Sequence, residues 1–358
     1  SMATSLRASY AVNLLLLGGV ACVGESSTLD PGAHESEPAI IFQAEATFVA
    51  LFPRPDGVVV VDSAAAHFLD RSGNEVATFA PGRTITAAAG DGTYLAVADQ
   101  ITLTVLDWSL AQVREAPLER PCSSGVVLSQ HRLICRGGLG FGTRGFTVYD
   151  LVTASSLGEA EGGGTSPLRA VPGTDMFMTV GGFAPEFSLF ELELGTSLPR
   201  LVTVSNVHHE HLASHVFAFD GTPARHLINA TGEILLIRGP DCPANSGADC
   251  FVPGGGLGFV PDPPFIAMTD NGAGAVFTLR SASQARICMP EAPCALETVD
   301  VASRAVTQRI EYAQQVLWVG QLAYDPDGHQ LVLADLEPNG SAILPSARYA
   351  VHTIPLAQ

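Results

Sequence analysis

The feature that most restricts the fold of this chain is an internal repeat of strand, turn and strand. Each copy has an apolar segment, a turn rich in Pro, Asp and Gly, and a second apolar segment ending in Asp. Proline presets φ, aspartate bonds its own backbone and glycine adopts positive φ, so these turns suit a reversal between two strands. The clearest copies span residues 51–62, 88–99, 259–270 and 323–335.

A third apolar segment, ending in an acidic or amide residue, follows each of these units. These segments end at Asp70, Asp107, Asp150, Glu191, Asn229 and Asp300. The first five end points lie 37, 43, 41 and 38 residues apart, and the interval to Asp300 is longer. A period of about 40 residues is typical of a propeller blade built from a four-stranded sheet.

Counting the innermost strand of each unit gives seven blades. We expect these strands near residues 47–52, 84–89, 124–129, 166–171, 213–219, 255–260 and 318–324. The last unit ends after its third strand at 350–354, while a spare apolar segment at 39–43 precedes the first unit. The spare strand would complete the last blade and remove exposed sheet edges. The predicted fold is therefore all-β, a seven-bladed β-propeller of four-stranded antiparallel blades closed by an N-terminal strand.

The repeat resembles the WD40-like and YVTN-type propeller superfamily. The resemblance rests on Pro-Asp-Gly turns before an apolar strand, as at 55–57, and on strands such as Val148-Tyr-Asp-Leu151 before a polar hairpin. It covers about residues 39–355. No unit carries the Gly-His and Trp-Asp pairs of true WD40 repeats, so the resemblance extends to the broader class alone. It implies a rigid binding platform more often than an enzyme.

The N-terminus has the pattern of a bacterial export signal. Arg7 is followed by an apolar stretch at 11–21, which suits the h-region of a signal peptide and is too short for a membrane-spanning helix. Gly19-Val20-Ala21-Cys22 resembles a lipoprotein cleavage site, with Gly19 where leucine is usual. We expect a signal peptide at 1–22 with lipidation at Cys22, a flexible tether at 23–38 and the propeller at 39–358. The chain would lie at the bacterial outer membrane or cell surface, or in the periplasm.

The other six cysteines fall into three closely spaced pairs. Closely spaced pairs in polar segments favour disulfides in an oxidising compartment, although six cysteines allow fifteen pairings. The pairs predicted from proximity are Cys122 with Cys135, Cys242 with Cys250, and Cys288 with Cys294.

The formal net charge of −18 restricts the partners. Nucleic acids and anionic lipids both require a basic surface, and the sequence contains no basic patch. We therefore expect no nucleic-acid partner and membrane contact through the lipid anchor alone. The expected partner is a protein or glycan that binds a monomer. It would bind the loop face, the face that carries the loops entering the innermost strands.

Candidate site residues gather on the loop face where second strands end. In the repeat pattern an Asp closes several second strands. Together these aspartates would form an acidic rim, which could act as a ring of cation ligands with Ca²⁺ as the candidate ion. Asp at a strand end also commonly accepts bonds from loop amides, and we favour this reading. The rim residues are Asp62, Asp99, Asp270 and Asp335.

One histidine cluster adds a candidate transition-metal site. Four of the ten histidines lie within eight residues: His208, His209, His211 and His215. Their spacing could seat Zn, Cu or Ni, and the competing interpretation is a solvated polar loop, which we favour.

Two hypotheses for function follow from these observations. The leading one is an exported, lipid-anchored, non-enzymatic binding module that uses its loop face. The alternative is a metal-dependent lyase or hydrolase with the histidine cluster at the centre of that face. A quinone-dependent dehydrogenase is weaker, because such propellers are larger and rich in Trp, and this chain has two Trp residues.

Overall fold

The repeat forms seven four-stranded antiparallel sheets. In this computed structural model the described residues are 39–137, 145–161, 168–170, 175–181, 186–192, 198–205, 216–218, 225–230, 233–238, 251–253, 265–271, 273–281, 288–300, 303, 305–316, 319–337 and 348–356. The chain is all-β, and the one helical element in this described part is the 3-10 turn η1 (Ser129–His131). The predicted signal peptide and tether lie outside the described residues.

Three sheets follow one another in the first half of the chain. The first contains β2 (Phe48–Arg54), β3 (Gly57–Asp62), β4 (Ala66–Asp70) and β5 (Glu75–Phe79). The second contains β6 (Ala87–Gly90), β7 (Tyr94–Ala98), β8 (Thr102–Asp107) and β9 (Gln112–Pro117). The third contains β10 (Cys122–Leu128), β11 (Arg132–Gly137), β12 (Gly145–Asp150) and β13 (Ser155–Glu161).

Three further sheets repeat this order. The fourth contains β14 (Arg169–Ala170), β15 (Met176–Gly181), β16 (Glu186–Leu192) and β17 (Pro199–Ser205). The fifth contains β18 (Val216–Ala218), β19 (Arg225–Ala230), β20 (Glu233–Arg238) and β21 (Phe251–Pro253). The sixth contains β22 (Phe265–Asp270), β23 (Ala275–Arg280), β24 (Cys294–Asp300) and β25 (Ala305–Tyr312).

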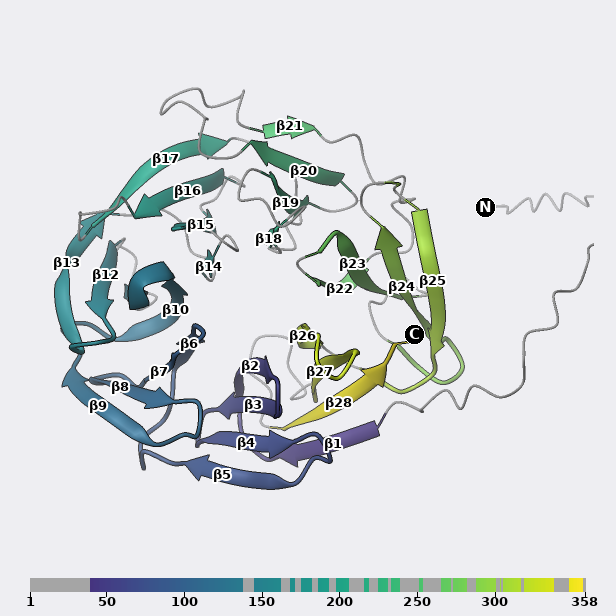
Figure 1. Ribbon diagram of the computed structural model, residues 1–358, viewed down its shortest axis with the longest axis horizontal. Helices are drawn as coiled ribbons and strands as arrows, with labels where there is room; N and C mark the ends of the chain where they lie inside the picture. Colours follow the sequence, from purple (N-terminus) through teal and green to yellow (C-terminus); the bar gives the residue numbers. More distant parts are fainter. Residues whose placement is uncertain are drawn as a thin grey trace, which may run out of the picture. The chain divides into compact units, whose positions relative to one another are not determined.

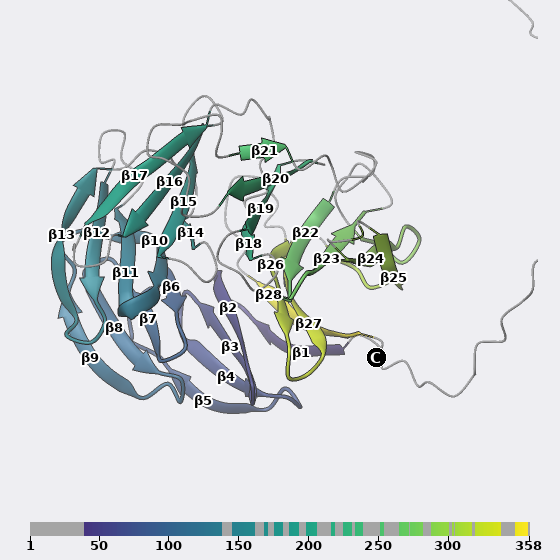
Figure 2. The same ribbon diagram turned by 45° about the horizontal axis from the view of Figure 1, so that its top comes forward.

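The seventh sheet joins strands from opposite ends of the chain. Its order is β26 (Val319–Asp325), β27 (Gln330–Leu336), β28 (Tyr349–Pro355) and then β1 (Ala39–Ala44). The pairing of β1 with β28 is antiparallel and runs from Ala39 opposite Thr353 to Ala44 opposite Tyr349. The spare N-terminal strand therefore completes the last sheet, as the sequence predicted (Figure 2).

The sheets are arranged around a common centre, with the first strand of each nearest to it (Figure 1). Neighbouring innermost strands contact one another in the order β14, β10, β6, β2, β26, β22 and β18. The first and last sheets thus lie side by side through β2 and β26. This arrangement is compatible with a propeller-like fold.

The core lies between neighbouring sheets rather than within one layer. All six residues of β3, Gly-Val-Val-Val-Val-Asp, are buried, because both faces of this strand are covered. Val59 and Val61 pack with Leu95 and Val97 of the next sheet and with Ile85 in the connection that leads to it. The outermost strand β9, in contrast, is mostly exposed. A continuous apolar run therefore marks an inner strand such as β3, and a largely exposed run marks the outermost strand β9.

The aspartates that end third strands cap the hairpins that follow them. Asp70 Oδ1 accepts hydrogen bonds from the backbone N–H groups of Ser72 and Asn74, at 2.8 and 2.9 Å. Asp107 Oδ1 accepts from the amides of Ser109 and Ala111 at 2.9 and 3.1 Å. Such Asx-type bonds satisfy loop amides locally. The repeated Asp is therefore explained by turn formation.

The glycine of the Pro-Asp-Gly turn is required by a close approach. A Cβ at Gly57 would lie 1.9 Å from the carbonyl oxygen of Leu69 on the adjacent strand β4. No side chain fits in that space, so this turn needs glycine for packing.

The sequence prediction is wrong in the fifth and sixth sheets. Asn229 lies in β19, the second strand of its sheet, and not in a third strand. The sixth innermost strand is β22, not residues 255–260. The cause is a second turn signal at 271–274, where Asn271 Oδ1 accepts from the amides of Ala273 and Ala275 at 2.9 and 3.0 Å.

Candidate functional site

Three of the four predicted rim aspartates lie where second strands end. Asp62 is the last residue of β3 and pairs with Phe48 at the start of β2. Asp335 lies near the end of β27 and pairs with Val319 at the start of β26, while Asp99 directly follows β7. These pairings place them on the face from which the chain enters the innermost strands, here called the loop face.

Asp270 does not belong to this group. It is the last residue of β22, a first strand, and therefore lies at the opposite end of its sheet from the entry side. The prediction that it closes a second strand is wrong, because the apolar segment 265–270 forms the first strand of its sheet.

Asp62 and Asp99 are held by the loops that follow them. Asp62 Oδ1 accepts from the amides of Ala64 and Ala65 at 2.7 and 2.9 Å. Asp99 Oδ1 accepts from the amides of Ile101 and Thr102, both at 2.7 Å. Among the residues that the structure describes, no group of His, Cys, Asp and Glu side chains is placed to hold a metal ion. The hydrogen bonds agree with the turn-forming role of these two carboxylates.

Asp62 also joins the first sheet to the last. Its Oδ2 accepts the Tyr349 hydroxyl of β28 at 2.8 Å and lies 3.3 Å from His67 Nε2. Burial opposes the charge of Asp62, but bonds from His67, two backbone amides and Tyr349 outweigh it and lower the pKa of the carboxyl. Burial, and then the Asp62 carboxylate, raise the pKa of Tyr349. The tyrosine therefore stays protonated and donates.

His67 lies between two carboxylates. Its Nε2 faces Asp62, and its Nδ1 lies 2.9 Å from Glu75 Oε2 on β5. Burial lowers the pKa of His67, but the bonds and charges of Asp62 and Glu75 outweigh this and raise it above the ordinary value. Because Asp62 also accepts the Tyr349 hydroxyl of β28, His67 supports this contact between the first and last sheets from within the first sheet.

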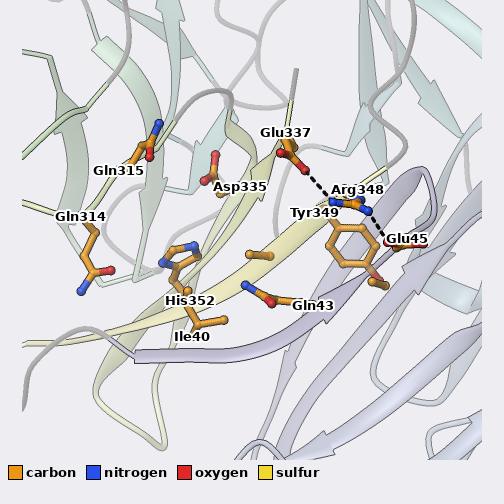
Figure 3. Close-up of a pocket in the computed structure, with 12 residues that line it drawn as sticks. Ile40, Gln43, Glu45, Gln314, Gln315, Asp335, Glu337, Arg348, Tyr349 and His352 are labelled. Carbon is orange, nitrogen blue, oxygen red and sulfur yellow. Dashed lines mark hydrogen bonds and ion pairs between the residues drawn. The ribbon is translucent and has the colours of Figure 1, made fainter. Parts of the chain in front are cut away.

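A hollow opens on the loop face between the seventh sheet and the segment that enters it. Its volume is about 520 Å³. One side is the seventh sheet, with Gln43 of β1, Asp335 of β27 and His352 of β28, and the facing side is formed by Gln314 and Gln315 after β25 (Figure 3). The remaining lining residues are Ile40, Ala44, Glu45, Glu337, Arg348, Tyr349 and Ala350.

The register of the sheet explains why a hollow forms here. Asp335 pairs with Ala350, and Ala350 pairs with Gln43, so these three residues form one row across three strands. Directly paired residues project from the same face of a sheet. The small Ala350 between two longer side chains leaves open space in the middle of the row.

An arginine closes one end of the hollow. Arg348 forms ion pairs with Glu45 at the end of β1 and with Glu337 after β27 (Figure 3). Because these side chains are exposed, the pairs add little stability. Their effect is local, because they hold the start of β28 between β1 and β27 and neutralise the positive charge of Arg348.

A buried histidine lies beneath the polar lining. The His352 side chain is 3% exposed, and its Nδ1 lies 3.1 Å from the Tyr312 hydroxyl of β25. Its Nε2 is buried and has no hydrogen-bond partner among the described residues. Burial lowers the pKa of His352, so the imidazole is neutral at pH 7. A buried polar atom without a partner is uncommon in a folded protein.

Two of the three predicted disulfides are present in the described residues. Cys122 and Cys135 join the start of β10 to β11 with Cα atoms 5.5 Å apart, at the loop face. Cys288 and Cys294 are joined with Cα atoms 5.1 Å apart. Both bonds fit an oxidising, exported environment.

The second disulfide supports one side of the hollow. Cys288 forms an antiparallel bridge with Val316, with N···O distances of 2.9 and 3.0 Å in the two directions. Val316 directly follows Gln314 and Gln315, so the disulfide anchors the segment that carries both amides to the start of β24.

Other predicted site residues lie outside the described residues. These are His208, His209, His211, His215, Cys22, Cys242 and Cys250. The segment with the last two cysteines joins β20 to β21, the third and fourth strands of the fifth sheet.

Sequence reasoning missed the hollow itself. Gln43, Arg348, Ala350 and His352 carry no motif, and they come together through the pairing of β1 with β28. The predicted pairing of 39–43 with 350–354 was the signal that could have found them, had the alternation of side chains been followed.

No helix within the described residues is long and apolar enough to cross a bilayer. The sequence matches no known protein family, and no curated protein is similar to it.

Proposed function

We propose that the seven sheets close into a seven-bladed propeller of the WD40-like and YVTN-type class. The pairing of β1 with β28 and the contacts between β2 and β26 support closure between the first and last sheets. Mixing N- and C-terminal strands in one sheet removes an exposed edge and ties the ends of the domain together.

On this scaffold we propose an exported, lipid-anchored binding module that uses its loop face and performs no chemistry of its own. The observation that carries the proposal is the polar hollow of about 520 Å³ at the loop face. Concave sites with a few converging polar groups are where proteins usually bind ligands. The disulfides favour export, and Cys22 would supply the anchor.

Partner capture with the full chain tests the binding role. The chain would be used as bait for envelope and medium fractions of the source organism, beside two matched variants. Ala350→Phe fills the hollow, and Ala111→Phe adds the same ring at an exposed position in the hairpin between β8 and β9, away from the loop face. We expect wild type and Ala111→Phe to enrich the same partner and Ala350→Phe to lose it. Enrichment of nothing above background would overturn the proposal.

The anchor has its own test. Cys22→Ser should move the protein from the membrane fraction to the soluble fraction without changing partner capture. An unchanged membrane association would exclude lipidation at Cys22.

The histidine-rich segment supports a metal-dependent enzyme as a second candidate. Its last member, His215, directly precedes β18, an innermost strand, in the sequence. Elemental analysis of purified protein tests this idea. Stoichiometric Zn, Cu or Ni that is lost in a His209→Ala/His211→Ala double variant would favour it, and metal-free protein would exclude it.

A further inference from the structure

The hollow on the loop face is built from groups that can hydrogen-bond in both directions. Gln43, Gln314 and Gln315 each carry an amide, which donates and accepts. Asp335 adds a carboxylate that accepts, and it stands in the same row as Gln43 with Ala350 between them. The ring of donors and acceptors surrounds open space and not a packed core.

The width of the hollow matches a small ring. β27 and β1 are separated by β28, so the strands carrying Asp335 and Gln43 are two strand spacings apart, about 10 Å. The volume of about 520 Å³ lies within the range of small-molecule sites. Ile40, 50% exposed at the edge, offers an apolar surface beside the polar row.

The charge of the lining excludes anionic ligands. Glu45, Asp335 and Glu337 provide three carboxylates against the single guanidinium of Arg348, and that guanidinium is already ion-paired with two of them. A ligand carboxylate, sulfate or phosphate would meet net negative charge. Neutral and positively charged ligands remain.

The lining amides distinguish between these two classes. The amides of Gln43 and Gln315 offer N–H donors as well as carbonyl acceptors, and a hydroxyl group can bond both, whereas an ammonium group can bond only the carbonyl. Beneath them, the buried Nε2 of His352 has no hydrogen-bond partner among the described residues, and a bound water between it and a ligand hydroxyl would satisfy either tautomer. The lining therefore favours a ligand rich in hydroxyl groups over a cation.

We propose that this hollow binds a neutral saccharide, with Gln43, Asp335 and the Gln314–Gln315 segment bonding its hydroxyl groups along the floor formed by Ala350. The proposal rests on the proposed binding function and narrows it to one ligand class. The Cys288–Cys294 disulfide holds the glutamine segment in place through Val316, so the site is preorganised on that side.

The test is binding of the full chain to immobilised neutral, amino-bearing and acidic oligosaccharides, followed by titration of the best neutral glycan in solution. We expect binding to neutral glycans and none to uronic or sulfated ones. Ala350→Phe should weaken binding at least tenfold and Gln43→Ala about three- to tenfold. Ala111→Phe should leave binding unchanged, and thermal unfolding of each variant shows whether it is folded.

The outcomes separate this proposal from the proposed function. No binding to any neutral glycan, or binding that folded Ala350→Phe and Gln43→Ala both retain, overturns the saccharide site. If a protein partner is still captured and lost with Ala350→Phe, the binding function stands and its ligand is a protein. Spermidine binding that Ala350→Phe abolishes, without glycan binding, overturns the proposal in favour of a cation site.

Discussion

The hydroxyl of Tyr349 links the last sheet to the first, and its removal gives a quantitative test of that junction. Tyr349 and Asp62 are 3% and 1% exposed, and the hydroxyl donates to Asp62 Oδ2 at 2.8 Å. Tyr349→Phe keeps the ring and deletes only this bond. A hydrogen bond to a charged, buried group contributes about 1.5–3 kcal/mol, so we expect the free energy of unfolding to fall by this amount.

The thermal shift follows from the size of the domain. An unfolding entropy of about 2 cal/mol/K per residue over roughly 320 residues gives about 0.7 kcal/mol per degree. Tyr349→Phe should therefore lower Tm by about 2–5 °C in differential scanning calorimetry. The matched control is Tyr324→Phe, whose hydroxyl lies 3.5 Å from His329 Nδ1 at an exposed position and should cost under about 0.5 kcal/mol.

The pH dependence of this loss has a definite sign. The pKa of Asp62 is lowered in the folded protein, and the bond from Tyr349 is one of the causes. Stability from such a group is fully present above the unfolded pKa, near 3.9, and is lost as pH falls through the lower folded pKa. The difference between wild type and Tyr349→Phe should stay constant from about pH 5 to 7 and narrow below about pH 4. A Tyr349→Phe loss no larger than that of Tyr324→Phe would refute the reasoning.

Three further predictions concern the same part of the molecule. His67→Gln should lower the free energy of unfolding most below about pH 6.5, and progressively less as pH rises through the raised pKa of His67. Urea unfolding at pH 5.5 and 8.5 would check this, and an equal loss of unfolding free energy at both pH values would contradict it. The Gln321 side-chain amide accepts a hydrogen bond from Leu51 N at 3.0 Å and donates one to Leu51 O at 2.8 Å. Gln321→Ala should therefore lower the free energy of unfolding by about 1–3 kcal/mol and speed hydrogen exchange at the Leu51 amide. Unchanged exchange at Leu51 would count against this link. The Cys288→Ala/Cys294→Ala double variant lacks the cross-link that closes a loop in the unfolded chain, so its free energy of unfolding should fall by about 2 kcal/mol in chemical denaturation. Its glycan binding, measured by titration, should also be weaker. A glycan affinity equal to that of wild type would show that the disulfide does not support the hollow.

Local patterns predicted the elements whose signals are local. The Pro-Asp-Gly turn and the valine run at 57–62 identified β2 and β3, because turn chemistry and continuous burial both act within a few residues. The pairing of Cys122 with Cys135 followed from their proximity in the sequence, because the two residues lie on consecutive strands joined by a short turn. The pairing of β1 with β28 followed from counting strands.

Prediction failed where two turn signals competed. Residues 259–264 contain prolines and an aspartate that match the repeated turn, yet the structure uses Asn271 to form the turn between the first and second strands. This error displaced Asp270 to the wrong face. The hollow could not be found from composition, because Gln43 becomes a neighbour of Ala350 and Asp335 only through pairing across some 300 residues. The register between β1 and β28 therefore determines which residues line the hollow.

The most direct test of a binding site at this hollow is hydrogen exchange of the full chain with and without its captured partner or glycan. We predict protection in peptides that cover residues 39–45, 312–316 and 333–337, which carry the lining side chains. Peptides that cover the opposite turns, at 54–57 and 90–94, should exchange as in the free protein. Protection confined to those opposite turns, with none at the hollow, would contradict the account.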